Sequence, residues 1–323
     1  MHPSLTSSRV AIVSGKGGVG KTTIAAALAK AAAAQGKRVL LLEVEGRNSL
    51  APLFGIPSLG YPEHVVAPNL SAESVVPDEA LVEYLYMFYG IKRIGKALAH
   101  TKATEFATNI APGLRDILLI GKVKEAERRR VREAYAFDLV VLDAPPTGRL
   151  PRFLDAPRAV ADLVRAGPIR TQAHGVLDMI TDPARSAVVL VTLPEEMPVQ
   201  ETVESIATLR RMGVAVGPVV VNRVAAEPFT KTVERSLISD ARKAIARAME
   251  KAGVAAPAAT LERLAAVAAA SARRTRNQRA VMTELEADID RPMISVPALL
   301  SPTVGPAEVD FLASVLSDSG AIS

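Results

Sequence analysis

Short apolar runs alternate with longer segments of helical periodicity along most of the chain. Runs that are apolar at nearly every position are typical of parallel strands buried on both faces. The predicted strands lie at residues 9–13, 38–44, 70–76, 136–142, 186–193, 214–221 and 292–296. Because these strands alternate with helices, the pattern predicts an α/β fold: a doubly wound, mostly parallel sheet flanked by helices.

Two long segments carry apolar residues largely at positions i, i+3, i+4 and i+7, the spacing of a helix face. They lie at about 77–133 and 152–182, and we expect them to form a helical subdomain inserted into a single domain of residues 1–323. A third helical region, 230–288, is interrupted by an Ala- and Pro-containing segment. Residues 50–68 contain several prolines and are predicted to be loop.

The 323 residues include no cysteine, which excludes disulfides, cysteine-based zinc sites and iron–sulfur clusters. Aromatic residues make up only 4% and tryptophan is absent, so the core must be built from Ala, Val, Leu and Ile. The formal net charge of +5 suits nucleic acid, anionic lipid or nucleotide phosphate and does not choose among them.

Residues 1–8 are mostly polar and are followed by Arg9, without the apolar segment of a signal peptide. The chain has no uncharged, strongly apolar run of about 18 residues, and the Ala-rich helix predicted at 24–34 contains Lys30. We therefore expect no transmembrane segment and a soluble, cytoplasmic protein.

Residues 14–23 read SGKGGVGKTT and fit the pattern G-x-x-x-x-G-K-[ST] between a predicted strand and a predicted helix. The glycines let backbone N–H groups converge on a phosphate, and the N-terminus of the helix adds positive potential. Lys21 would hold the β- and γ-phosphates, and the Thr22 hydroxyl would ligate Mg²⁺. The predicted nucleotide-binding residues of this loop are Gly15, Lys16, Gly17, Gly18, Val19, Gly20, Lys21, Thr22 and Thr23.

Two further strand ends carry residues that suit a nucleotide, because ligands in such sheets bind outside the carboxyl ends of the strands. Asp143 ends one apolar strand, and we predict that it orients Mg²⁺ together with Thr22. Gly148 follows it and could bring a backbone N–H close to the γ-phosphate. Asn222, followed by Arg223, ends another strand, and an Asn amide can donate to and accept from an adenine edge at once.

Two carboxylates, Glu43 and Glu45, lie at the end of the strand predicted at 38–44. Being two residues apart, they face the same way. Phosphoryl transfer to water needs a carboxylate or amide that orients the nucleophile, and either side chain could do this. A helix-capping or salt-bridging pair is the alternative interpretation.

The position of Lys16, directly after the first glycine of GKGGVGKT, resembles the deviant Walker A loop of a class of P-loop NTPases. This class contains the partition, nitrogenase-iron-protein and ArsA-type ATPases. Its first lysine reaches across a dimer to the partner's nucleotide. The resemblance therefore implies a catalytic role for Lys16 in a dimer.

Further segments resemble the ArsA family, which includes the arsenite-pump ATPase and the guided-entry ATPase that delivers tail-anchored membrane proteins. They are spread over nearly the whole chain: APGLRDILLIGKVKE (111–125), DAPPTGR (143–149), PEEMPVQET (194–202), VVVNR (219–223) and PALLSP (297–302). The second resembles the family's switch II, and the last two its adenine-site segments. The resemblance implies ATP and Mg²⁺ as cofactors, with Asn222, Arg223 and Pro297 near the adenine.

The chain also departs from the family pattern. The family's switch I reads DPAH, with the Asp placing the attacking water, whereas residues 45–48 read EGRN. Glu45 is therefore the predicted catalytic carboxylate. The switch II His is replaced by Arg149. Neither the zinc-holding CxxC nor the arsenite-binding cysteines have a counterpart, so we expect neither zinc nor metalloid transport.

The resemblance implies an ATP-driven switch: an ATP hydrolase that works as a homodimer or with a paralogous ATPase and couples its cycle to an unknown protein client. One alternative is a partition or positioning ATPase acting on DNA or membrane. Arg273, Arg274, Arg276 and Arg279 could supply a basic face for DNA, but residues 308–323 lack the basic helix of the membrane type. We do not expect nucleic acid to be the partner. The other alternative, favoured by the altered switch I, is a non-hydrolysing, nucleotide-binding regulatory subunit of a heterodimer.

Overall fold

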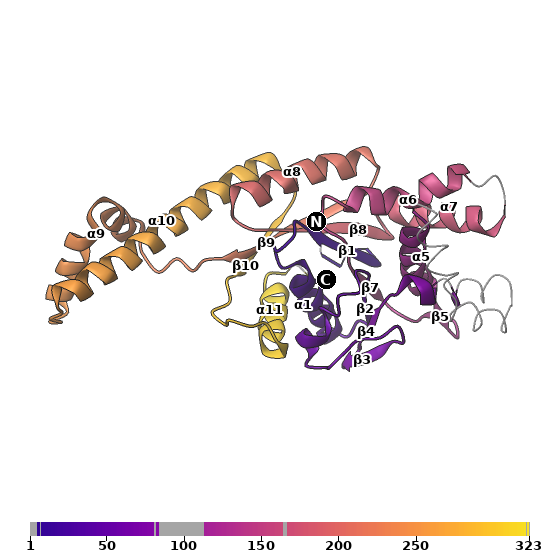
Figure 1. Ribbon diagram of the computed structural model, residues 1–323, viewed down its shortest axis with the longest axis horizontal. Coiled ribbons are helices and arrows are strands. Elements are labelled where there is room, and N and C mark those ends of the chain that lie inside the picture. The colour runs from indigo at the N-terminus through magenta and orange to yellow at the C-terminus, as the bar shows by residue number, and fades with distance from the viewer. Residues whose placement is uncertain are drawn as a thin grey trace.

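The computed structural model describes residues 5–6, 8–80, 82–83, 113–163, 167–320 and 322. It contains an eight-stranded sheet in the order β10-β9-β8-β1-β7-β2-β4-β3 (Figure 1). All pairs in this sheet are parallel except β3 with β4, at one edge. The strands are β1 (Val10–Gly15), β2 (Val39–Glu43), β3 (His64–Ala67), β4 (Leu70–Ser74), β7 (Leu139–Asp143), β8 (Ser186–Thr192), β9 (Val216–Val224) and β10 (Met293–Pro297). The sheet and its flanking helices confirm the predicted fold class.

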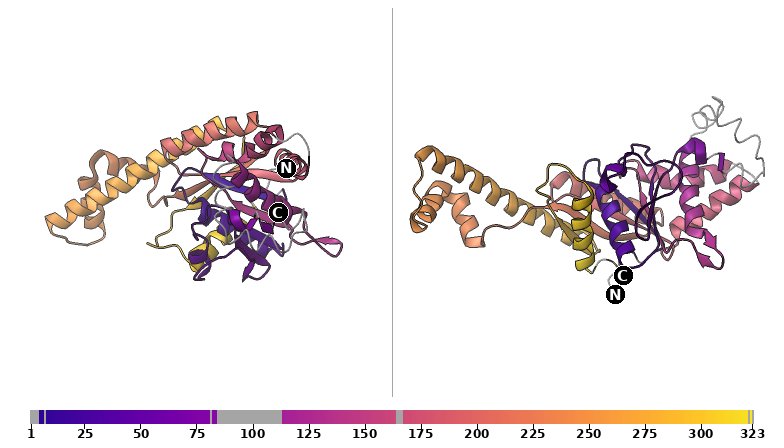
Figure 2. Two further views of the ribbon diagram at one scale, coloured as in Figure 1. Left: turned by 45° about the vertical axis from the view of Figure 1, so that its right-hand side comes forward. Right: turned by 90° about the horizontal axis from the view of Figure 1, so that it is seen from below.

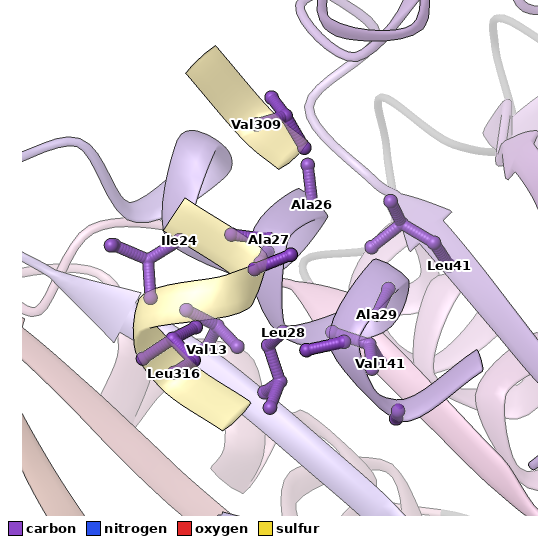
Figure 3. Close-up of a cluster of buried hydrophobic side chains, with 14 of the residues drawn as sticks. Val13, Ile24, Ala26, Ala27, Leu28, Ala29, Leu41, Val141, Val309 and Leu316 are labelled. Carbon is purple, nitrogen blue, oxygen red and sulfur yellow. The ribbon is translucent and has the colours of Figure 1, made fainter. Parts of the chain in front are cut away.

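Helices cover both faces of the sheet, and side chains of the central strands alternate between two buried clusters. On one face, α1 (Lys21–Ala34) and α11 (Pro306–Asp318) meet strand residues such as Val13 and Leu41 (Figure 3). The other face is covered by α5 (Leu114–Arg128), α6 (Leu150–Leu163), α7 (Pro168–Thr181), α8 (Glu196–Arg211) and the C-terminal end of α10 (Ala258–Asp288).

Burial on both faces explains the continuous apolar runs of the sequence. Every residue of β1, β2 and β7 is buried. Each fully buried Val, Leu or Ile contributes roughly 1.5–3 kcal/mol relative to an exposed one. The central strands therefore form a rigid platform, which fixes the positions where the loops at their carboxyl ends begin.

Two short regions differ from the prediction. Between residues 50 and 68, expected to be loop, the chain forms the 3₁₀ helix η1 (Ala51–Phe54) and the edge strand β3. The helix expected to reach about residue 133 ends at Arg128, and β5 (Arg130–Val131) and β6 (Ala134–Tyr135) form a hairpin. The helix ends because Arg129, its C-cap, has ψ of 134°, outside the helical range, and the hairpin turn contains Arg132 with a left-handed φ of 57°.

Helices α5, α6 and α7 pack on one another as well as on the sheet. Ile117 of α5, Val160 and Ala161 of α6, and Ala173 of α7 form a small core of their own. These helices, with residues 77–80 and 82–83, are the described helical part of the expected subdomain, whereas residues 81, 84–112 and 164–166 of that prediction lie outside the described residues. A separate subdomain therefore stays a prediction.

Helices α9 (Lys231–Lys251) and α10 form a hairpin. The connection between them, residues 252–257, lies in the Ala- and Pro-containing segment where the sequence predicts a break. Figures 1 and 2 show the hairpin projecting away from the sheet, with the C-terminal end of α10 returning beside α8. At about 1.5 Å per residue, the 31 residues of α10 span about 46 Å. Across the described ranges of the chain, no helix is both long and apolar enough to cross a bilayer.

Candidate nucleotide-binding site

The predicted phosphate-binding loop joins β1 to α1 at the carboxyl edge of the sheet. Gly18 and Gly20 have φ of 87° and 90°, values that favour glycine. A Cβ on Gly15 would lie 2.2 Å from the carbonyl oxygen of Val191, and one on Gly20 would lie 2.5 Å from Asn222 Nδ2. Among the described side chains none caps the first turn of α1, so its backbone N–H groups are available to an anion.

Lys21 and Glu45 meet beside this loop. Lys21 is buried, and its Nζ lies 3.8 Å from Glu45 Oε2. Arg47 Nη2 lies 3.8 Å from the other oxygen of the same carboxylate. The structure thus brings the predicted phosphate-binding lysine and the predicted catalytic carboxylate together.

Glu43, the rival carboxylate, has a different environment. Its side chain is buried, and Oε1 accepts hydrogen bonds from the backbone N–H and the hydroxyl of Ser49, at 2.9 and 2.6 Å. These bonds hold the turn that follows β2. Glu43 therefore stabilises the loop that carries Glu45.

Thr22 and Asp143 lie together as predicted for a Mg²⁺ site. The Thr22 hydroxyl donates to Asp143 Oδ2 at 2.8 Å, and the register of the sheet sets Asp143 beside Val13 and Glu43. Asp143 is 5% exposed, and its Oδ1 is buried without a hydrogen-bond partner among the described residues. An orphaned carboxylate oxygen beside a hydroxyl fits the one or two protein ligands that Mg²⁺ takes at nucleotide sites.

Burial raises the pKa of Asp143 to about 7, although the Thr22 hydrogen bond and the charge of Lys21 oppose the rise. The folded protein therefore holds a proton that the unfolded chain, with a pKa of about 4, has lost. We expect the stability of the nucleotide-free protein to fall as pH rises from about 4 to about 7, by up to about 4 kcal/mol from this group. Asp143→Asn should remove this contribution, as measured by urea denaturation at about pH 5 and about pH 8.

Asp138→Asn is the matched control for that experiment. A hydrogen bond from Arg38 holds the pKa of Asp138 below its usual value, so its contribution has the opposite sign. That contribution is present near neutral pH and is lost as pH falls. If Asp143→Asn loses as much stability between the two pH values as the parent, Asp143 is not the group that takes up the proton.

Lys16 points to a neighbouring helix of its own chain. Its Nζ lies 3.4 Å from Glu201 Oε2 on α8, and the hydroxyl of Thr147 donates to the other oxygen of Glu201. Glu201 lies in the segment PEEMPVQET, but nothing in its sequence pattern indicates this pairing. One carboxylate thus joins the P-loop to the loop that follows β7.

That loop is tied to the P-loop at two more points. Ser14 Oγ donates to the carbonyl of Pro145 at 2.6 Å, and the N–H of Thr147 donates to the carbonyl of Gly15 at 3.2 Å. Gly148 is exposed, and an added Cβ would meet nothing within 4 Å. Arg149 pairs with Asp116 of α5 at 2.8 Å, so it connects the loop to the helical layer.

The predicted adenine-binding residues lie at the neighbouring ends of β9 and β10. Asn222 Nδ2 donates to the carbonyl of Val19 at 2.8 Å, and its Oδ1 accepts from the N–H of Arg223 at 2.9 Å. Arg223 is exposed, with φ of 58°, and Pro297 ends β10 beside Val224. Both ends of the Asn222 amide are used within the chain, so its contact with adenine stays a prediction.

Comparison with known proteins places this site in a family. A family model described as "Anion-transporting ATPase" matches residues 8–172 and 169–251. The chain belongs to the ArsA ATPase family. This membership confirms the resemblance drawn from the motifs.

Individual relatives agree with the family. The chain is 47% identical over 225 residues to "ATPase BagA" of Mycobacterium tuberculosis, covering 68% of this chain and 66% of the relative. It is 25% identical over 249 residues to "Putative arsenical pump-driving ATPase 2" of Aquifex aeolicus, covering 68% and 81%. It is 25% identical over 255 residues to "Putative arsenical pump-driving ATPase" of Prosthecochloris vibrioformis, covering 67% and 61%. The match to the first relative thus spans just under two thirds of that protein's length.

Proposed function

We propose that this protein is an ATP hydrolase that works as an ATP-driven switch in a dimer. The Thr22–Asp143 pair supports this most, because its buried oxygen Asp143 Oδ1 has no partner in the described part of the chain. A hydroxyl and a carboxylate are what P-loop NTPases offer to the Mg²⁺ of a bound nucleotide. We therefore take ATP and Mg²⁺ as the cofactors.

The residues of the site would divide the work as follows. The loop glycines and the N-terminus of α1 bind the phosphates through backbone N–H groups. Lys21 leaves Glu45 for the β- and γ-phosphates, and this exchange frees the Glu45 carboxylate to orient water. Mg²⁺ held by Thr22 and Asp143 would neutralise phosphate charge.

Dimer closure would use Lys16. In the single chain Lys16 is held by Glu201, and the proposed exchange moves its ammonium to the nucleotide of a second subunit. The second subunit is another copy of this chain or a paralogous ATPase. Glu201 also accepts a hydrogen bond from Thr147, so release of Lys16 would change the position of Glu201 and, through Thr147, that of the loop after β7.

Lys16→Ala is expected to lower ATP turnover about tenfold, the scale of one charge-assisted hydrogen bond. The affinity for ATP should stay within about twofold of the parent's, because Lys16 would contact the nucleotide of the second subunit and not that of its own. ATP-dependent dimerisation, followed by light scattering, should weaken in parallel with turnover. Lys16→Arg keeps the charge and is the control. A parent protein that hydrolyses ATP at its full rate as a monomer would contradict the dimeric switch.

Switch I supports a second candidate, a nucleotide-holding subunit with little hydrolysis of its own. Gly46 has φ of 64°, whereas the proline of the family's DPAH is fixed near −65°. The loop that carries Glu45 therefore has a conformation that the family's residue cannot adopt. Single-turnover hydrolysis of bound ATP, alone and with a paralogous ATPase, distinguishes the two candidates.

The client and the cellular location are further proposals. Some relatives are named arsenical pump-driving ATPases, but this chain has no cysteine thiolate, the soft ligand that would suit arsenite. We propose a protein client at α5, α6 and α7, because Arg149 joins these helices to the nucleotide site through Asp116. A cytoplasmic location stays a prediction.

A further inference from the structure

The hairpin of α9 and α10, residues 231–288, is here called the arm. Its helices pack on each other along small side chains, Ala265, Ala269 and Ala272, which lie on one face of α10. Such residues let helix backbones come close but bury little apolar area. The views in Figures 1 and 2 agree that the outer part of the arm stands away from the sheet. Its larger apolar side chains therefore have few places to be buried.

An apolar groove of about 490 Å³ runs along the arm. It is lined by Ile245 and Met249 of α9, by Leu264 and Val267 of α10, and by Val254 of the connection. Val254, Leu264 and Val267 are 55%, 46% and 69% exposed. A contiguous apolar surface of this kind, as opposed to single exposed residues, is typical of an interaction site.

The arm also carries the positive charge of the protein. Residues 231–288 contain eleven Lys and Arg against seven Asp and Glu, a formal charge of +4 out of +5 for the whole chain, and the central part, 235–279, has ten against three. The rest of the chain has a formal charge of only +1, so most of the net positive charge lies on the arm. An electrostatic field of this sign favours a partner with negative charge.

Two arginines flank the groove on α10. Arg263 and Arg274 lie four residues before and seven after Val267, so all three share one stripe of the helix. Both arginines are exposed, and neither forms an ion pair with a described residue. Arg279, nearer the sheet, pairs instead with Glu227 and Glu234. The uncompensated charge thus lies beside the exposed apolar residues.

We propose that this groove binds an amphipathic helix of an acidic partner protein. Apolar side chains of that helix would enter the groove, and carboxylates on its flanks would pair with Arg263 and Arg274. The arm of a second copy is disfavoured, because two charges of this sign would repel. A flat bilayer would not fill the groove, and a nucleic-acid backbone would leave its apolar lining exposed. The inference does not depend on the proposed ATPase activity.

The test uses the full chain without nucleotide and a labelled helical peptide of about 18 residues, long enough to form a helix. Leu residues at i, i+3, i+4 and i+7 form its apolar face, and Glu residues flank that face. A matched peptide carries Lys in place of Glu. Fluorescence anisotropy should detect binding of the acidic peptide, and the affinity for the basic peptide should be at least about tenfold lower.

Two variants localise the binding. Val267→Asp should weaken binding of the acidic peptide at least about tenfold, because it places a charge in the groove. Arg263→Glu with Arg274→Glu should reverse the preference between the peptides. Val233→Asp is the control, since Val233 is 44% exposed on α9 but does not line the groove. Circular dichroism checks that each variant is folded.

Several outcomes would overturn the proposal. These are equal binding of the two peptides, binding of neither, or no effect of Val267→Asp. Co-sedimentation with phosphatidylserine vesicles that Val267→Asp abolishes would assign the arm to membranes instead. A salt-dependent shift of duplex DNA that needs Arg263 and Arg274 would assign it to nucleic acid. Self-association lost in Val267→Asp would assign the groove to a second copy.

Discussion

Lys21→Ala is expected to abolish tight binding of Mg·ATP, with an affinity loss of at least about 100-fold. The side chain is buried in the first turn of α1 and lies 3.8 Å from the Glu45 carboxylate. Its removal deletes the main cation for the β- and γ-phosphates. It also leaves the exposed Arg47 as the cation paired with Glu45, whose negative charge lies beside them. Isothermal titration calorimetry of the full chain with Mg·ATP measures the effect.

Lys30→Ala is the matched control, because Lys30 lies on the same helix but pairs with Asp310 of α11. The double variant Lys21→Ala with Glu45→Gln separates the two causes. Part of the affinity should return if repulsion by Glu45 contributes. Parent-like affinity in Lys21→Ala would exclude this loop as the nucleotide site.

The strands that position the site are predictable from sequence because they are buried on both faces. β1, β2 and β7 are apolar at nearly every position, and no helical or half-exposed pattern competes with that interpretation. β3 is different: it is a short edge strand in which Val65 is 81% exposed, so it lacks that signal. Prolines around it made loop the better prediction.

The site is predictable only in part. The P-loop and Asp143 follow from the sequence because their backbone positions at strand ends determine what they can reach. Whether the pairs Lys16–Glu201 and Lys21–Glu45 form depends on the rotamers of these long side chains, and no local sequence pattern specifies a rotamer. The choice between Glu43 and Glu45 likewise needs Ser49, because alternation along a strand puts both carboxylates on the same side.

The arm illustrates a different limit. Its helices and their break follow from periodicity and composition, but exposure of Leu264 and Val267 does not. Apolar residues at helical spacing look the same whether they face a sheet or solvent. Only the projection of the hairpin from the sheet, visible in Figure 1, leaves these side chains open.

Glu45→Gln is expected to lower kcat about 100-fold, the scale of one positioned general base, with little change in Mg·ATP affinity. A carboxylate that orients water acts mainly in the transition state, so binding should be spared. Gln keeps the size and one acceptor but removes the charge. Glu43→Gln is the matched comparison two residues away. Its remaining oxygen can still accept from Ser49, so its rate should stay close to that of the parent.

Two further variants test whether the shape of switch I sets the rate. Glu45→Asp restores the family's carboxylate but shortens the side chain by one methylene, which withdraws the carboxylate from the nucleotide and should lower the rate. Gly46→Pro added to it should lower activity further, because proline cannot adopt the φ of 64° found at Gly46. A gain of rate in the double variant would mean that the loop changes conformation when ATP binds.

Parent-like hydrolysis by Glu45→Gln together with a slow Glu43→Gln would move the catalytic role to Glu43. A parent that stays inert even with its partner ATPase would make this chain the nucleotide-holding subunit.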